Sequence, residues 1–350
     1  MGYIVPAPVL TNLYSSKVRQ LMLTETAIKE IISFKFQVFD EPTVHTCILL
    51  LSKEESKKGY GTNMVAIKKG LLSKEALEGP FDYEIKQAQL STGTAATIDI
   101  FTRDEETTGV FDRMRKGNYL LGDICYLRQC IKTGDDKTYV KEFDKAPGEP
   151  WKPTLKGRTI GRYGVAKSNI YLKYGPWLAR NWKNKSFYET EKIVVRETGS
   201  RLTATLDTGN HYVLSSLYGI YLRNDSTAFS HKFLLGLLNS ELATYFIKKT
   251  AFELTEGAFT KFRTNQLAKF PIPKLNIKIP ADKKKQDDVV DLVDQLLAGY
   301  AGLAAHKLAS AKEQAQARLR HLERRLDGLV YDLYQLTEEE QAHVSGGAAG

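Results

Sequence analysis

The stretch KIVVRETGSRLTATLDTGNHYVLSSLYGIYL, residues 192–222, concentrates side chains that could recognise a ligand. Two apolar, β-branched runs flank its polar centre and predict a pair of strands. With them lie two arginines, several threonines, an asparagine and a histidine. A turn that only closes a core does not need this much hydrogen-bonding capacity. We therefore expect this hairpin to present polar groups to a binding partner.

Residues with the chemistry for catalysis do not form a complete set. The segment FDYEIK orders Asp82, Glu84 and Lys86 as in a metal-dependent nuclease, but such triplets are common in sequences rich in lysine and glutamate. No glycine-rich dinucleotide loop, P-loop or nucleophile elbow is present, and the six histidines lack metal-ligand spacing. The residues indicate that this chain carries no complete active site.

The charge balance favours a polyanionic partner. The 350 residues carry a net charge of +9, and nucleic acid is the first candidate. An anionic membrane surface is second, because no strongly basic amphipathic segment lies near either end. No apolar run approaches the roughly 18 residues of a membrane span, and the first residues lack the pattern of a signal peptide. Cys47, Cys125 and Cys130 form no C-x-x-C pair, so we expect reduced thiols, no structural zinc and a cytoplasmic protein.

The elements that must position these groups predict a mixed, α+β fold. Residues 1–53 alternate strand and helix patterns and look like the last strands and helix of an α/β domain. Residues 54–105 predict a polar, lysine-rich linker or bridge. Residues 106–275 predict short strands with one inserted helix, HKFLLGLLNSELATYFIKK. Residues 284–336 predict two helices or one interrupted helix, and residues 337–350 predict a flexible tail.

Several motifs occur in one order along the chain: GYIVPAPVLTNLYSSKVRQLML, IKEIISFKFQVFDEPTVHTCILLLS, KIVVRETGSRLTATLDTGNHYVL, LLGLLNSELATYFI, LAKFPIPKL and LDGLVYDLYQLTEEE. In this order they resemble the C-terminal part of type IIG restriction-modification enzymes and related adenine-N6 DNA methyltransferases. The resemblance implies that residues 1–53 end a methyltransferase domain and that residues 106–275 form a TaqI-like target-recognition domain. It spans nearly the whole chain and depends on the ordered set, not on any single motif.

The chain also departs from that family. The glycine-rich S-adenosylmethionine loop and the Asn-Pro-Pro-Tyr catalytic motif, which precede GYIVP in such enzymes, occur nowhere in the sequence. The nuclease of type IIG enzymes, which lies upstream, is missing too. We therefore expect no cofactor in this chain. The resemblance implies S-adenosylmethionine for the intact enzyme and a catalytic half in the same polypeptide or in a separate subunit. The absence of these motifs fits three alternatives: an expressed fragment, a truncated gene product, or a natural half of a split enzyme.

The resemblance also implies roles for individual residues. Phe39, in VFDEPT, matches an aromatic side chain that stacks on the target adenine after it leaves the duplex, and the alternative is packing under the sheet edge. In the hairpin, arginine can bridge guanine O6 and N7, asparagine suits adenine, and a threonine methyl can contact thymine. The candidates for reading bases are Arg196, Arg201, Thr203, Thr205 and His211. The alternative is a solvated hairpin whose arginines form ordinary surface ion pairs.

Basic residues interleaved with aromatic residues suit phosphate contacts, which fix the register of a protein on a duplex. They lie in WKPTLKGRTIGRYG and YLKYGPWLARNWKNKSFY, with a weaker patch in EGAFTKFRTNQLAKF. The candidates are Lys152, Lys156, Arg158, Arg162, Lys173, Arg180, Lys183, Lys185, Lys261 and Arg263. The aromatic residues between them are expected in the core.

We therefore expect sequence-specific recognition of double-stranded DNA. It would position an adenine for S-adenosylmethionine-dependent N6 methylation by a catalytic region outside this chain. A second hypothesis is a non-catalytic specificity subunit that assembles with separate methyltransferase or restriction chains. The missing cofactor motif and the helices of residues 284–336 favour it. A third hypothesis is a binder of single strands or RNA that uses its aromatic residues.

Overall fold

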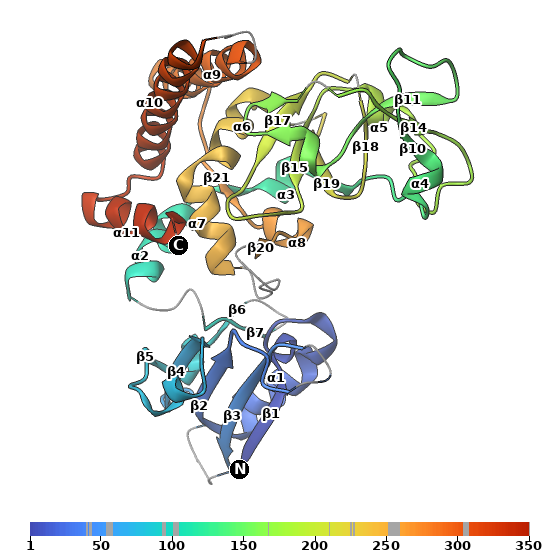
Figure 1. Ribbon diagram of the computed structural model, residues 1–350. Coiled ribbons are helices and arrows are strands. Elements are labelled where there is room, and N and C mark those ends of the chain that lie inside the picture. Colours follow the sequence, from blue (N-terminus) through green and yellow to red (C-terminus); the bar gives the residue numbers. More distant parts are fainter. Residues whose placement is uncertain are drawn as a thin grey trace. The chain divides into compact units, whose positions relative to one another are not determined.

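The computed structural model describes the chain except residues 40, 42–43, 54–58, 93–95, 101–104, 167, 210, 225, 227, 251–259, 304–307 and 350. The chain forms two compact units, unit 1 from Met1–Phe111 and unit 2 from the described residues after Phe111 (Figure 1). Helices and strands occur in both, which confirms the predicted mixed class. In the described part of the chain, no helix is long and apolar enough to cross a membrane.

Unit 1 is built on a five-stranded sheet with the order β1-β3-β2-β4-β5. The strands are β1 (Gly2–Pro6), β2 (Ala27–Phe34), β3 (Thr46–Ser52), β4 (Met64–Leu71) and β5 (Tyr83–Lys86), and helix α1 (Ser16–Glu25) precedes β2. Strands β2 and β4 pair in parallel, and the other neighbours pair antiparallel. Residues 64–86 therefore differ from the predicted linker. They extend the sheet because Val65 and Ile67 alternate along β4 and are fully buried.

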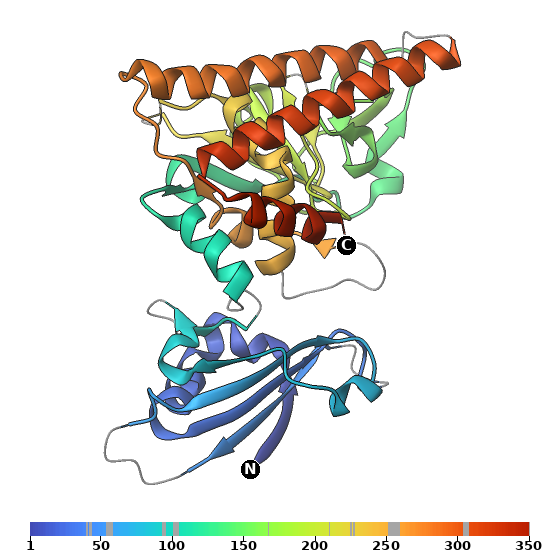
Figure 2. The same cartoon turned by 90° about the vertical axis from the view of Figure 1, so that its left-hand side faces the viewer.

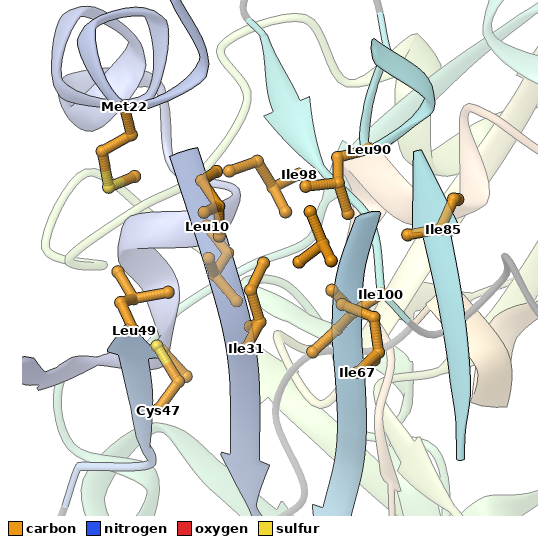
Figure 3. Close-up of a cluster of buried hydrophobic side chains, with 13 residues drawn as sticks. Leu10, Met22, Ile31, Cys47, Leu49, Ile67, Ile85, Leu90, Ile98 and Ile100 are labelled. Atoms are coloured by element: carbon orange, nitrogen blue, oxygen red, sulfur yellow. The ribbon is translucent and has the colours of Figure 1, made fainter. Parts of the chain in front are cut away.

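An apolar cluster packs against the sheet of unit 1 (Figure 3). Leu10 joins Ile31 of β2 and Ile67 of β4 in this cluster. Full burial of one such side chain stabilises a fold by about 1.5–3 kcal/mol. Cys47 of β3 is in the same cluster, and burial raises the pKa of its thiol to about 12. It is a free thiol that serves as a core residue.

Unit 2 contains two four-stranded sheets that share an apolar core. Their orders are β17-β15-β19-β9 and β10-β14-β11-β18. The strands are β9 (Cys125–Gln129), β10 (Val140–Glu142), β11 (Trp151–Leu155), β14 (Ile170–Lys173), β15 (Lys192–Arg196), β17 (Ala204–Asp207), β18 (Tyr212–Val213) and β19 (Leu217–Leu222). Val194 of the first sheet packs with Leu155 and Val213 of the second. Two strands, β16 (Thr198–Gly199) and β17, therefore lie within the polar centre of the hairpin predicted over residues 192–222, and its second apolar run is divided into β18 and β19.

The single inserted helix predicted at residues 231–249 is instead two helices, α6 (His231–Asn239) and α7 (Glu241–Thr250). Ser240 separates them, and its hydroxyl accepts a hydrogen bond from the amide of Ala243 at 3.1 Å, which caps α7. The side chain of Asn239 accepts from the amide of Ala204 and donates to the carbonyl of the same residue, each at 2.9 Å. Asn239 thereby fixes α6 to the backbone of β17.

The C-terminal residues form three helices, α9 (Pro280–Gly302), α10 (Ala309–Leu333) and α11 (Glu338–Ala349) (Figure 2). The first two agree with the predicted helix pair. The predicted flexible tail was wrong, because α11 packs against α7 and Val344 is fully buried. A capping box starts α11: the amide of Thr337 donates to Glu340 at 2.8 Å, and the amide of Glu340 donates to the Thr337 hydroxyl at 3.3 Å.

Short elements complete the two units. The short strands are β6 (Ser91–Thr92), β7 (Thr97–Ile98), β8 (Tyr119–Leu120), β12 (Ile160–Gly161), β13 (Gly164–Val165), β16 (Thr198–Gly199), β20 (Thr260–Lys261) and β21 (Pro271–Ile272). The remaining helices are α2 (Glu105–Arg115), α3 (Leu121–Ile124), α4 (Asp136–Tyr139), α5 (Ser186–Glu189) and α8 (Thr264–Leu267). Single 3-10 turns are η1 (Ala7–Leu10), η2 (Leu13–Ser15), η3 (Glu75–Glu78), η4 (Gln87–Gln89) and η5 (Gly157–Thr159).

Candidate nucleic-acid interface

A surface cavity of about 350 Å³ opens in unit 2 beside the end of β15, the strand β16 and the turn η5. Three arginines, Arg158, Arg196 and Arg201, line it. The rest of the lining is small or hydroxylated: Gly157, Thr198, Gly199, Ser200, Thr203 and Ser216. The cavity offers hydrogen-bond donors and positive charge, so it suits an anion or the acceptor-rich edge of a base.

Backbone contacts fix the shape of this cavity. The amide of Arg196 donates to the carbonyl of Thr203 at 2.9 Å, which closes the loop between β15 and β17. The amide of Gly157 donates to the hydroxyl of Ser216 at 2.9 Å, which ties η5 to β19. Gly199 must lack a side chain, because a Cβ there would lie 2.9 Å from the carbonyl oxygen of Arg201.

The arginines differ in how far they are already engaged. Arg158 is exposed and pairs with Glu142 at 2.9 Å, a surface ion pair that contributes little and can be exchanged. Arg196 donates one N–H to the carbonyl of Ile160, and its Nε is buried without a partner. Within the described residues, the guanidinium of Arg201 forms neither a hydrogen bond nor an ion pair. Arg196 and Arg201 therefore bring positive charge to the cavity, and among the described residues neither forms an ion pair with a carboxylate.

Charged groups of α7 and α10 act on Arg201 from within unit 2. Burial lowers the pKa of Arg201, the nearby Arg162 lowers it further, and Glu323, Asp327 and Glu241 oppose both effects. The pKa of Asp327 is raised to about 7, chiefly by burial, and its carboxylate accepts the amide of Glu241 at 2.8 Å. The C-terminal helices thus contribute charge to the surroundings of a cavity residue.

Arg162 was wrongly predicted as a phosphate contact. Its side chain is 8% exposed and pairs with Glu323 of α10 at 2.9 Å. It also donates to the carbonyl of Asn239 at the end of α6. The guanidinium therefore joins three segments of unit 2 and does not reach solvent.

Two of the five base-reading candidates lie away from the cavity. Thr205 is 1% exposed because it lies in β17, so the prediction that it reads a base conflicts with its burial. The Nδ1 of His211 lies 2.8 Å from the carboxylate of Asp207, which also pairs with the buried Lys192 at 2.5 Å. Burial alone would raise the pKa of Asp207, but the hydrogen bond from His211 and the charge of Lys192 outweigh it and lower that pKa. His211 thus belongs to an internal charge cluster.

Three further phosphate candidates are engaged within the protein. Arg180 donates to the carbonyl of Cys130 at 3.2 and 3.1 Å and to the side chain of Gln129 at 2.7 Å. Lys152 pairs with Glu149 at 2.5 Å, and Lys261 pairs with Glu197 at 3.3 Å. Arg180 therefore serves the fold, whereas the two lysines have partners that a phosphate would have to displace.

The remaining candidates are placed at or near the surface. Lys183 and Lys185 are exposed, and Lys156, Lys173 and Arg263 are half-buried. The ammonium of Lys173 lies 5.4 Å from the centre of the Trp177 ring, and that of Lys185 lies 5.9 Å from the Tyr174 ring. Phe39 of unit 1 is 47% exposed, so its ring is available for stacking.

Sequence reasoning missed the small residues that shape the cavity. Gly157 follows β11, and Ser216 directly precedes β19 inside the apolar run predicted as a strand, so neither residue type indicated a binding role. A second cavity, of about 500 Å³, lies between α9 and α10 and is lined in part by Asp288, Asp291 and Asp332. Among the described residues, no cluster of three or more histidine, cysteine, aspartate or glutamate side chains is suited to a metal ion.

Comparison with known proteins places the cavity within a known kind of domain. A family model described as the TaqI-like C-terminal specificity domain matches residues 152–272. A curated relative from Methanocaldococcus jannaschii, provisionally named as a type II restriction enzyme and methyltransferase, is 25% identical over 340 residues. That match covers 95% of this chain but 27% of the relative, so the chain spans about a quarter of the relative's length.

Two solved structures are similar to this chain. The type IIL restriction-modification enzyme MmeI, solved in complex with DNA, has a TM-score of 0.57 at 10% identity, over 99% of this chain and 49% of that one. The type IIG restriction endonuclease BpuSI has a TM-score of 0.39 at 14% identity, over 95% of this chain and 47% of that one. The likeness to MmeI indicates a shared fold. The residues that line the arginine-lined cavity all lie within the segment that matches the TaqI-like C-terminal specificity domain, residues 152–272.

Proposed function

We propose that unit 2 recognises a short sequence in double-stranded DNA through the arginine-lined cavity. One observation supports this most directly: Arg196 and Arg201 lie beside hydroxyl groups in one cavity, and neither forms an ion pair with any carboxylate that the structure describes. A guanidinium can donate two hydrogen bonds to O6 and N7 of guanine, and threonine and serine can contact either kind of base. Ser200 would add a hydroxyl to the reading surface. Thr203, 8% exposed, lies at the floor of the cavity and donates its hydroxyl to the carbonyl of Arg201 at 3.3 Å.

In the same proposal, basic residues at the surface bind the phosphate backbone. Lys183 and Lys185 are exposed, and Arg158 becomes available when its surface pair with Glu142 opens. Such contacts orient a protein on the duplex and carry little sequence information. They also make the affinity fall as salt is added.

We also infer that the protein serves adenine-N6 methylation, with Phe39 stacking on the flipped base. The sequence resemblance supports this, as does the exposure of the Phe39 ring. The lining of the arginine-lined cavity contains no carboxylate that could hold the sulfonium cation of S-adenosylmethionine. In this proposal the cofactor and the transfer step belong to a catalytic region outside this chain.

Selection of bound duplexes from a random-sequence pool, at two salt concentrations, tests the recognition. We expect the wild-type protein to enrich one short DNA motif at both salt concentrations. The Arg201→Gln variant should enrich the same motif but lose the preference for a particular base at one position of it. Arg320→Gln, an exposed arginine of α10, removes the same charge and should leave the motif unchanged. Binding without enrichment would overturn sequence reading, and no binding would favour the specificity subunit that acts by assembly.

A further inference from the structure

A second basic surface lies on β9, the edge strand of the first sheet of unit 2. Tyr126 and Arg128 alternate along β9, so their side chains point to the same side of the sheet. Tyr126 is 42% exposed. The guanidinium carbon of Arg128 lies 5.5 Å from the centre of this ring, and that of Arg223 lies 4.3 Å from it. Two cations thus share one exposed aromatic ring.

Further rings hold Arg128 in place. Its guanidinium carbon lies 4.8 Å from the centre of the Trp182 ring and 5.1 Å from that of Phe187. The indole N–H of Trp182 donates to the carbonyl of Gln129 at 3.1 Å, which fixes this ring on β9. Cation–π contacts attract a guanidinium without cancelling its charge. Arg128 is therefore oriented by its neighbours through contacts that leave its positive charge uncompensated.

Neither arginine is neutralised by the protein. Among the residues that the structure describes, no carboxylate pairs with Arg128 or Arg223. Arg223 donates one N–H to the carbonyl of Gly122 at 2.9 Å, and Arg128 donates to no acceptor. An arginine placed only for packing would more commonly be paired, because an unpaired, partly buried charge is costly.

We propose that Arg128 and Arg223, with Tyr126 between them, bind a phosphodiester group of DNA. The ring of Tyr126 is already engaged by two guanidiniums, so the groups left for a ligand are N–H donors and positive charge. Phosphate oxygens match these donors, and arginine binds them with planar, two-point geometry. This inference rests on the proposed function, since it adds a backbone contact to the duplex that the cavity reads.

The salt dependence of duplex binding tests this surface. For the full chain, the slope of log affinity against log salt should fall by about 1 for Arg128→Gln and by about 2 for the double variant with Arg223→Gln. The affinity should weaken by the same factor for the selected duplex and for an unrelated duplex. Arg320→Gln is the matched control, and its slope should stay at the wild-type value because it lies outside the surface.

Modification of the native protein provides a second readout that needs no variant. An arginine-selective reagent, with mass spectrometry of the peptides, should label Arg128 in the free chain and label it several-fold less when duplex is bound. Unchanged slopes together with unchanged labelling would overturn the phosphate contact, while selection of a motif by the same protein would leave the proposed function standing. Absence of any duplex binding would overturn both. If a variant unfolds, the labelling experiment still tests the phosphate contact, because it uses the native protein.

Discussion

Asp327 gives the stability of unit 2 an unusual dependence on pH. Burial raises the pKa of this carboxyl to about 7 in the folded chain, and the charge of Glu241 adds to the effect. In the unfolded chain the carboxyl titrates near its ordinary value of about 3.9. Between these values the folded chain binds the proton and the unfolded chain does not, so stability falls as pH rises. Above about pH 7 both states are ionised and the loss is complete.

The magnitude follows from the two pKa values. The interval from pH 5 to the folded pKa of about 7 is about two pH units. Over this interval the unfolding free energy falls by about 1.36 kcal/mol per pH unit. Wild-type unit 2 should therefore lose about 3 kcal/mol of unfolding free energy between pH 5 and pH 8 through Asp327 alone. Asp327→Asn keeps an oxygen to accept the amide of Glu241 but has no proton to lose. The variant should escape this loss and be more stable than the wild type at pH 8.

Urea denaturation followed by tryptophan fluorescence measures the effect. All three tryptophans, Trp151, Trp177 and Trp182, lie in unit 2, so the signal reports its unfolding. Asp332→Asn, at an exposed position of the same helix, is the matched control and should follow the wild-type curve. Wild-type and Asp327→Asn curves that run parallel from pH 5 to pH 8 would refute the reasoning, because Asp327 would then be ionised throughout in the folded chain.

Three further predictions concern unit 2 and the thiols. Glu323→Leu should destabilise unit 2 by about 3–5 kcal/mol in urea, because it leaves the buried Arg162 unpaired, and Arg162→Met in the same chain should restore most of the loss. Arg201→Gln should reduce discrimination at one base pair by about 1–3 kcal/mol in competition binding, with little change in affinity for unrelated duplexes. Burial raises the pKa of the Cys125 and Cys130 thiols to about 12, so a thiol reagent at pH 8 should leave the folded chain unlabelled and label it in urea.

Several residues of the candidate site could be predicted from the sequence because they lie close together along the chain. Arg196, Arg201 and Thr203 lie within one polar segment between two strand patterns, and the fold brings them to one cavity. Thr205 belongs to the same segment, but a third strand passes through it, and alternation along β17 buries this side chain. Residue types alone do not tell which polar residues of a segment face the core.

Contacts between distant parts of the chain could not be predicted in this way. Arg162 has the neighbours of a phosphate ligand, yet Glu323, far along the sequence, makes it an internal ion pair. Arg128 lies on β9 and Arg223 directly follows β19, so the ring that they share appears only when β9 and β19 pair. The helix α11 had a local signal, the capping box at Thr337, but its glycine-rich end concealed the buried contact with α7.

The side-chain amide of Asn239 affects which amino-acid substitutions the loop before β17 can accept. The Asn239 side chain forms hydrogen bonds with both the backbone N–H and the backbone carbonyl of Ala204. These bonds fix the start of β17 independently of the side chains in the loop before it. We therefore expect the side chains of Thr198, Ser200 and Arg201, which line the cavity, to tolerate exchange while β17 stays in place. Single substitutions at these positions should then change the ligand that the cavity prefers without a new fold. Substitution of Asn239 itself would remove that tolerance.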